Sequence, residues 1–146
     1  MRRRWLPALV ALLFVSGQHP ALACSCVPFT KPQLIENAAV IFTGVVTGGS
    51  RQFSFGIPCS VSSADPVTFS FDVETVYKGD VPKATAVTTV VGGASCGYEF
   101  VSGRRYTVFG TSAGGKLETN LCRGNVEGAI DPSEYGLGPG HAPLAR

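Results

Sequence analysis

The strongest constraint on the fold of this chain is its set of five cysteines, Cys24, Cys26, Cys59, Cys96 and Cys122. All of them follow residues 1–23, which have the features of an export signal. Export implies an oxidising compartment, in which disulfides are the expected state of cysteine pairs. Zinc binding is the alternative, but a Cys-x-Cys pair without a neighbouring histidine is a poor zinc pattern. Because the count is odd, one cysteine is left over.

Residues 1–23 carry the three parts of a secretory signal peptide. Arg2, Arg3 and Arg4 form the basic start, and an apolar run of 11 residues, 5–15, follows. The small residues Ala21 and Ala23 mark a cleavage site. An uncleaved membrane anchor is the alternative, although the apolar run is short for a bilayer. We therefore expect a secreted or periplasmic protein that begins at Cys24.

Cleavage changes the charge of the chain. It removes three of the 12 basic residues, so that nine face ten acidic ones and the net charge falls from +2 to about −1. The remaining chain has no basic cluster beyond Arg104 and Arg105. Nucleic-acid binding therefore is not expected, because such proteins carry a basic patch that meets the phosphates. We expect a monomer.

Hydrophobic patterns after the signal predict a mostly β domain. A short helix over 31–39 is followed by strands over 40–46, 67–77, 84–91, 105–110 and 116–121. Residues 51–65 are expected to form a long irregular excursion. Closely spaced strands with many glycines favour a small antiparallel barrel or sandwich. Gly, Pro and small residues dominate 123–146, which predicts a loosely packed or disordered tail.

The inventory of reactive side chains argues against an enzyme. After residue 23 the only histidine is His141, in the Gly/Pro-rich tail. Nucleophilic catalysis of the Ser-His or Cys-His kind needs an imidazole held rigidly beside the nucleophile. Asp72 and Glu74 share one strand face, and we interpret them as solvated side chains. We expect neither catalysis nor a bound cofactor.

An N-terminal Cys24 would nevertheless offer an unusual ligand to a metal. Its backbone amine and its own carbonyl oxygen can close a five-membered chelate ring. An α-amine has a pKa near 8, so the neutral form is accessible. If Cys24 and Cys26 are both tied by disulfides, the terminus becomes rigid and loses little entropy on docking. Such a chelate fits the open fourth position of a catalytic zinc held by another protein.

Several short motifs resemble one known family. These motifs are Cys24-Ser25-Cys26-Val27-Pro28, Pro32-Gln33 with Asn37, Val40-Ile41, Val76-Tyr77-Lys78-Gly79, Ser95-Cys96-Gly97-Tyr98 and Leu121-Cys122. In this order they resemble the tissue inhibitors of metalloproteinases, which begin Cys-(Ser/Thr)-Cys directly after signal cleavage. The resemblance covers residues 24–122 and corresponds to the N-terminal, netrin-like inhibitory domain. It implies a five-stranded OB-fold-like barrel with short flanking helices, stapled at its N-terminus by Cys24–Cys96 and Cys26–Cys122.

The resemblance also implies a target and a binding edge. The target would be a zinc metalloendopeptidase, whose zinc the backbone amine and carbonyl of Cys24 would chelate. Ser25 would point into the pocket just past the scissile bond, and Cys26, Val27 and Pro28 would follow the cleft. The residues before Cys96, Ala94 and Ser95, would fill the other side of that cleft.

The chain departs from the family pattern in three places. The family has a third bridge that starts near the position of Glu36, and neither of its cysteines is present here. The family's second domain is replaced by the tail. Cys59 has no counterpart in the family, and we expect it to be unpaired or to bridge to another molecule. Two alternatives to the inhibitor therefore stay open. One is a netrin-like binding module without a protease target. The other is an envelope lipoprotein modified at Cys24, which would consume the thiol and block the amine.

Overall fold

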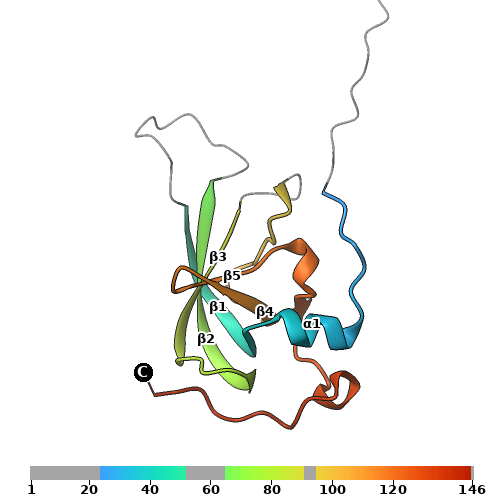
Figure 1. Ribbon diagram of the computed structural model, residues 1–146. Helices are drawn as coiled ribbons and strands as arrows, with labels where there is room; N and C mark the ends of the chain where they lie inside the picture. Colours follow the sequence, from blue (N-terminus) through green and yellow to red (C-terminus); the bar gives the residue numbers. More distant parts are fainter. Residues whose placement is uncertain (1–23, 52–64, 91–94, 146) are drawn as a thin grey trace, which may run out of the picture.

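The computed structural model describes residues 24–51, 65–90 and 95–145, which form a β-barrel with one α-helix beside it (Figure 1). Its elements are α1 (Lys31–Asn37), β1 (Val40–Arg51), β2 (Pro66–Lys78), β3 (Ala84–Val90), β4 (Arg105–Ala113), β5 (Lys116–Glu118), η2 (Leu121–Arg123), β6 (Val126–Glu127) and η3 (Pro132–Tyr135). The predictions for the signal segment 1–23, for Cys59 and for Ala94 lie outside the described residues. Within the described ranges, no helix has the length and apolarity that crossing a bilayer requires.

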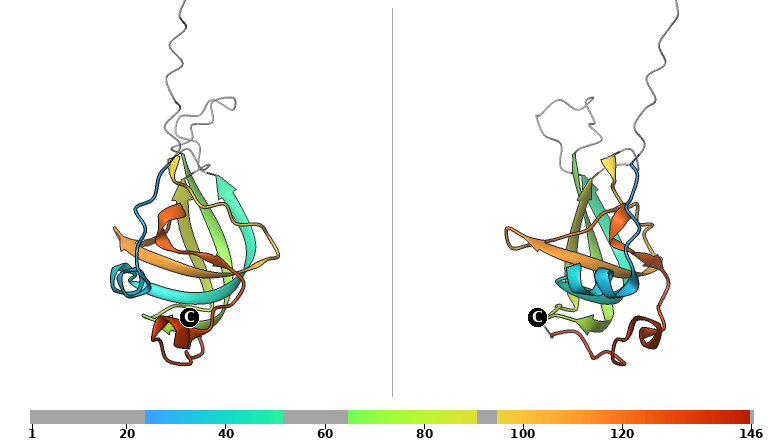
Figure 2. Two further views of the ribbon diagram at one scale, coloured as in Figure 1. Left: turned by 90° about the vertical axis from the view of Figure 1, so that its right-hand side faces the viewer. Right: turned by 45° about the vertical axis from the view of Figure 1, so that its right-hand side comes forward.

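Five strands close into a barrel in the order β1-β2-β3-β5-β4, and β4 returns to β1. The contact between β3 and β5 is parallel, whereas the other four contacts are antiparallel. The short strand β6 pairs with β4 outside this ring. Figure 2 shows the barrel from two further sides, with α1 and the C-terminal segment packed around it. The predicted OB-fold-like barrel is confirmed.

β1 closes the barrel because it pairs with two strands over the same residues. Its first half, 40–45, pairs with β4, and it pairs with β2 along most of its length. Register shifts in the β1–β2 ladder are bulges, which bend a strand. Gly44 lies at one of these shifts, where a Cβ would be 2.8 Å from the backbone oxygen of Asp72. The two backbones approach too closely there for any side chain on β1.

Alternation along β2 sends one set of side chains into the barrel. Phe71 and Val73 are buried, as the period of two in the sequence predicts. The rings of Phe42 and Phe100 meet Phe71 edge-on, with centroids 5.5 and 5.1 Å away. Edge-to-face pairs of this kind stabilise by about 1 kcal/mol beyond their burial. An aromatic cluster therefore fills the barrel.

The opposite face of β2 carries charges, which confirms that Asp72 and Glu74 are solvated. Asp72 pairs with Lys83 at 2.8 Å, and Glu74 pairs with Arg105 at 2.7 Å. The hydrogen bond from Arg105 lowers the pKa of the Glu74 carboxyl below its ordinary value. Because all four side chains are exposed to solvent, these pairs contribute little to stability.

The helix α1 covers the outer side of the barrel near β4. A reciprocal capping box starts it, in which the backbone N–H of Thr30 donates to the side chain of Gln33 at 2.9 Å. Leu34 and Ile35 of the helix pack against the cluster around Phe109. These apolar contacts hold the seven-residue helix in place, because so short a helix is not stable alone.

The C-terminal segment differs from its prediction. Instead of a loose tail, residues 123–145 follow the barrel surface through β6, η3 and two isolated bridges (Figure 1). His141 exchanges backbone hydrogen bonds with Val76 at 2.8 and 2.9 Å, and the Leu144 amide donates to Val81 at 2.9 Å. Backbone groups make these contacts. Side chains contribute as well, because Ile130, Tyr135 and Leu137 pack against the cluster around Phe109. A composition rich in Gly and Pro reveals neither the backbone bonds nor the packing of these few apolar side chains.

The close approach at β1 gives a stability prediction. Gly44→Ala should lower the free energy of unfolding by about 1–3 kcal/mol, because the added Cβ forces the β1 and β2 backbones apart. Gly48→Ala is the matched control on the same strand, since nothing lies within 4 Å of its Cβ position. Urea denaturation of the two variants measures the difference. Equal urea midpoints for Gly44→Ala and Gly48→Ala would contradict the close approach of the β1 and β2 backbones at Gly44.

Candidate functional site

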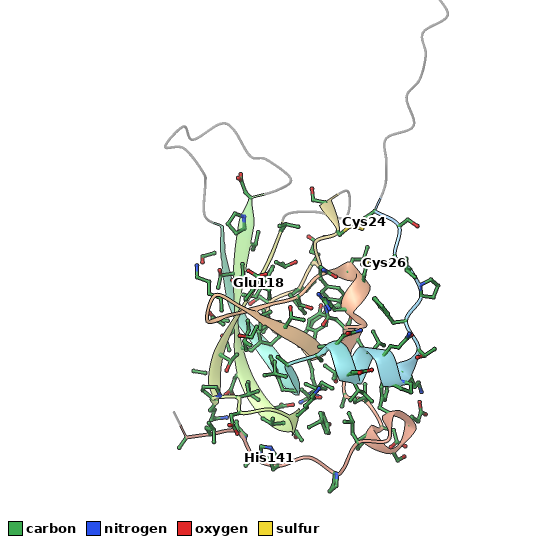
Figure 3. The ribbon with its side chains drawn as sticks, in the orientation of Figure 1. Cys24, Cys26, Glu118 and His141 are labelled. Atoms are coloured by element: carbon green, nitrogen blue, oxygen red, sulfur yellow. A yellow bond between two sulfur atoms is a disulfide. The ribbon has the colours of Figure 1, made fainter. Side chains whose placement is uncertain are left out.

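The candidate site is the first described segment, which two disulfides attach to the barrel. Cys24 is bonded to Cys96, and Cys26 is bonded to Cys122, each with a Cα–Cα distance of 5.2 Å. These are the pairings that the family resemblance implies. Figure 3 shows Cys24 and Cys26 at one end of the barrel, and His141 at the opposite end.

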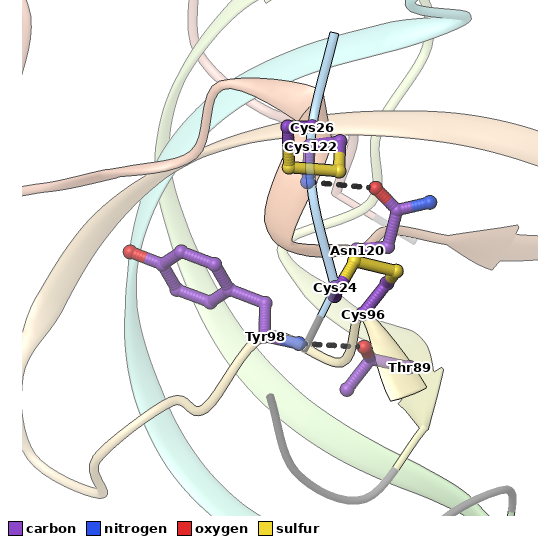
Figure 4. Close-up of a disulfide and its surroundings, with 7 residues drawn as sticks. All are labelled: Cys24, Cys26, Thr89, Cys96, Tyr98, Asn120 and Cys122. Carbon is purple, nitrogen blue, oxygen red and sulfur yellow. Dashed lines mark hydrogen bonds between the residues drawn. A yellow bond between two sulfur atoms is a disulfide. The ribbon is translucent and has the colours of Figure 1, made fainter. Parts of the chain in front are cut away.

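The barrel topology explains why the two partner cysteines lie together. β3 and β5 are parallel, so their carboxyl ends lie at the same end of the barrel. Cys96 follows β3 in the chain, and Cys122 follows β5 within η2. The Sγ atoms of Cys24, Cys96 and Cys122 all lie within 4.8 Å of one another. The two disulfides are therefore adjacent, and together they hold one short segment against the barrel (Figure 4).

Residues 24–30 have no helical or strand structure of their own; exposure alternates over residues 24–27, and residues 27–30 are all exposed. Cys24 and Cys26 are half-buried, as their bridges require. Ser25 is exposed, and the side chain of Val27 is 74% exposed. Pro28 is exposed as well. The clamps therefore present the intervening side chains to solvent, where another molecule can reach them.

The loop around Cys96 is fixed by two hydrogen bonds. The Tyr98 amide donates to the hydroxyl of Thr89 at 3.0 Å (Figure 4). The Cys96 carbonyl accepts from the Leu121 amide at 2.8 Å. Cys96 has a φ of 62°, the only positive value at a non-glycine residue of the described chain. Such a conformation persists where the surroundings enforce it. Ser95 beside it is half-buried.

A second network holds Cys122. The side-chain oxygen of Asn120 accepts from the Cys122 amide at 2.9 Å and caps η2. Asn125 connects this turn to the barrel, because its side chain accepts from the Phe109 amide at 2.9 Å and donates to Thr119 at 2.8 Å. Polar networks of this kind are stable when every member is paired. The position of Cys26 therefore depends on Asn120, which follows β5, and on Asn125, which lies between η2 and β6.

Sequence analysis did not identify Thr89, Asn120 or Asn125. An asparagine two residues before a cysteine is a local signal for a capped turn, and it could have indicated Asn120. Nothing in the sequence marks Thr89 or Asn125, because the amides that they bind, those of Tyr98 and Phe109, come from other parts of the chain.

The disulfide edge, which consists of residues 24–28 and Ser95, carries no ionisable side chain among its described residues. Its cysteines are in disulfides, and the others are Ser25, Val27, Pro28 and Ser95. Tyr98 lies nearby, and burial raises the pKa of its phenol, so it stays neutral at ordinary pH. An α-amine at Cys24 would therefore act without a competing charge on this edge.

The three clustered sulfur atoms are poor metal ligands in this state. Metals bind the cysteine thiolate, and these sulfurs are bonded in disulfides. If the exported chain begins at Cys24, as the sequence predicts, the backbone amine and carbonyl of this residue are the pair that could form a chelate.

A scan against protein-family models finds no match for this chain, and a search of curated proteins also finds none. The resemblance to the tissue inhibitors of metalloproteinases therefore stays a hypothesis, which depends on the residues named above.

The clamps give a second stability prediction. Cys26→Ala combined with Cys122→Ala should lower the free energy of unfolding by about 4 kcal/mol, the scale for opening a loop closed by residues 96 apart. The barrel should still form, because its aromatic cluster is untouched. Chemical denaturation of the double variant and of the parent checks this value. A change below about 1 kcal/mol would show that the bridge does little to restrict the unfolded chain.

Proposed function

We propose that this chain inhibits zinc metalloendopeptidases by inserting its disulfide-clamped N-terminal edge into the active-site cleft. The observation that carries the proposal is the double attachment of an exposed segment. Two adjacent bridges hold Cys24 and Cys26 against the barrel while Ser25 and Val27 face solvent. A signal peptide cleaved after Ala23 would make Cys24 the first residue of the exported protein.

The chemistry of inhibition is coordination to the zinc of the target protease. The neutral α-amine of Cys24 donates its nitrogen lone pair, and the Cys24 carbonyl oxygen completes a five-membered ring. A catalytic zinc keeps one position open for water or substrate, and this chelate would displace that water. The inhibitor itself needs no metal or cofactor and performs no catalysis.

Preorganisation supplies the affinity that a free peptide lacks. A linear Cys-Ser-Cys-Val-Pro peptide would lose roughly 1–2 kcal/mol of backbone entropy per residue on binding. Here the clamps restrict the segment before it meets the target. Val27 and Pro28 would continue along the cleft, while Ser95, with Ala94 from the sequence, would contact its other side.

The Cys24–Cys96 bridge also distinguishes between the alternatives. Lipid attachment needs the sulfur of Cys24, which the disulfide already uses. A binding module without a protease target would not need a free amine at its first residue. We therefore place the inhibitor first, acting as a secreted or periplasmic monomer on a zinc endopeptidase.

The position of the first amine is the critical test. Protein that begins at Cys24 should inhibit at least one member of a panel of zinc endopeptidases. One alanine added before Cys24 should abolish that inhibition, because it moves the amine away from the chelate ring. An alanine inserted between Gly114 and Gly115, at the far β-hairpin turn, is the control and should leave inhibition unchanged.

Thermal unfolding of all three proteins verifies that they are folded. Full inhibition by the protein with the added N-terminal alanine would rule out the chelate.

Ser25 tests how the edge selects a target. Its side chain is exposed, so Ser25→Gly should leave the melting temperature within about 2 °C. Inhibition constants against the panel should change unequally, because only the pocket past the scissile bond loses a contact. Ser25→Thr, which keeps the hydroxyl, is the matched control. Equal losses against every protease would contradict a pocket role for this side chain.

A further inference from the structure

A groove distant from the disulfide edge lies between β3 and the β4–β5 hairpin. It has a volume of about 460 Å³, and its walls include Pro82, Ala84 and Ala86 on one side and Gly115, Lys116 and Leu117 on the other. The β4–β5 hairpin projects from the barrel (Figure 2). The inhibitory function proposed above makes no use of it.

One wall of the groove is a strand edge that its neighbour does not cover. β3 begins at Ala84, but its parallel ladder with β5 contains only Val87 and Thr88. The Thr88 carbonyl points to the β5 side, where it accepts from the Thr119 amide at 3.0 Å. Peptide groups alternate along a strand, so those of Ala84 and Ala86 face the same side. In the described chain no strand lies beside Ala84 there.

The protein already binds an extended segment at the margin of this groove. Near the end of the C-terminal segment, the Leu144 amide donates to the Val81 carbonyl and the Lys83 amide donates to the Leu144 carbonyl, both at 2.9 Å. These bonds form a parallel bridge between Leu144 and Pro82, which itself lines the groove. Backbone pairing with an extended segment at this margin is therefore part of the fold.

Charge and side-chain type indicate what the groove accepts. Asp80 lies at one end and Lys116 at the other; both are exposed, and no ion pair within the described chain involves either. The groove has one cationic side chain and no aromatic ring in its lining. Single-stranded nucleic acids need a basic track and stacking rings, so they fit poorly. An extended peptide needs backbone partners, which the β3 edge supplies.

We propose that this groove binds an extended peptide segment of a partner protein by strand addition to β3. The peptide lies beside Ala84 and Ala86 and takes their backbone hydrogen bonds. An acidic residue of the peptide meets Lys116, and a basic residue at its other end meets Asp80. The site is independent of the disulfide edge, so both can be occupied together.

The test uses two capped hexapeptides, Ac-QTVTVE-NH2 and Ac-QTVTVQ-NH2, titrated into isotope-labelled protein and followed by amide NMR. Saturable shifts should be confined to the groove, including the amides of Ala84, Ala86 and Gly115. The peptide ending in Glu should bind about threefold more tightly, the scale of one exposed ion pair. Lys116→Gln should abolish that preference and leave the affinity for the neutral peptide unchanged.

Ala86→Pro removes one backbone donor and should weaken both peptides at least tenfold. Proline is tolerated where a strand N–H faces an open edge, and Lys116→Gln remains informative if this variant does not fold. Oligothymidylate and a neutral oligosaccharide serve as competing probes. The proposal is overturned if neither peptide saturates, if the shifts lie elsewhere, if Lys116→Gln keeps the preference, or if a competing probe binds the groove instead.

Discussion

The position of the N-terminal segment depends on the two adjacent disulfides that attach it to the barrel. Residues 24–30 form no ladder with any described strand, so the barrel alone does not fix them. The bridges of Cys24 and Cys26 replace those missing backbone bonds with covalent ones. They close long loops, which is where a disulfide restricts the unfolded chain most. An exposed segment thereby becomes a rigid edge.

The barrel brings the two anchor points together. Its one parallel contact, β3 with β5, directs the chain after each strand to the same end, where Cys96 and Cys122 follow. Hydrogen bonds from the Tyr98 and Cys122 amides to the side chains of Thr89 and Asn120 then fix the local turns. At the other end of the barrel, the C-terminal segment completes the surface through backbone bonds. The disulfide-linked segment and the backbone bridge of His141 therefore lie at opposite ends of the barrel (Figure 3).

Much of this could be predicted from the sequence, for physical reasons. The period-two pattern of β2 marked Phe71 and Val73 as inward and Asp72 and Glu74 as solvated, and the cysteine order matched a known frame of bridges. The tail was mispredicted because a composition rich in Gly and Pro hides both the backbone bonds of His141 and the few apolar side chains, such as Tyr135, that pack against the barrel. Asn125 was missed because its partners are brought near only by the fold. The exposed edge beside Ala84 follows from the short length of β5, and strand boundaries are poorly determined by sequence patterns.

The most direct test of the central claim is disulfide mapping and N-terminal analysis of the exported protein by mass spectrometry. The account predicts a chain that starts at Cys24 with an unmodified α-amine and contains the linked peptides Cys24–Cys96 and Cys26–Cys122. A chain that retains residues before Cys24, carries an acyl group on that amine, or joins these cysteines in another pattern would contradict it.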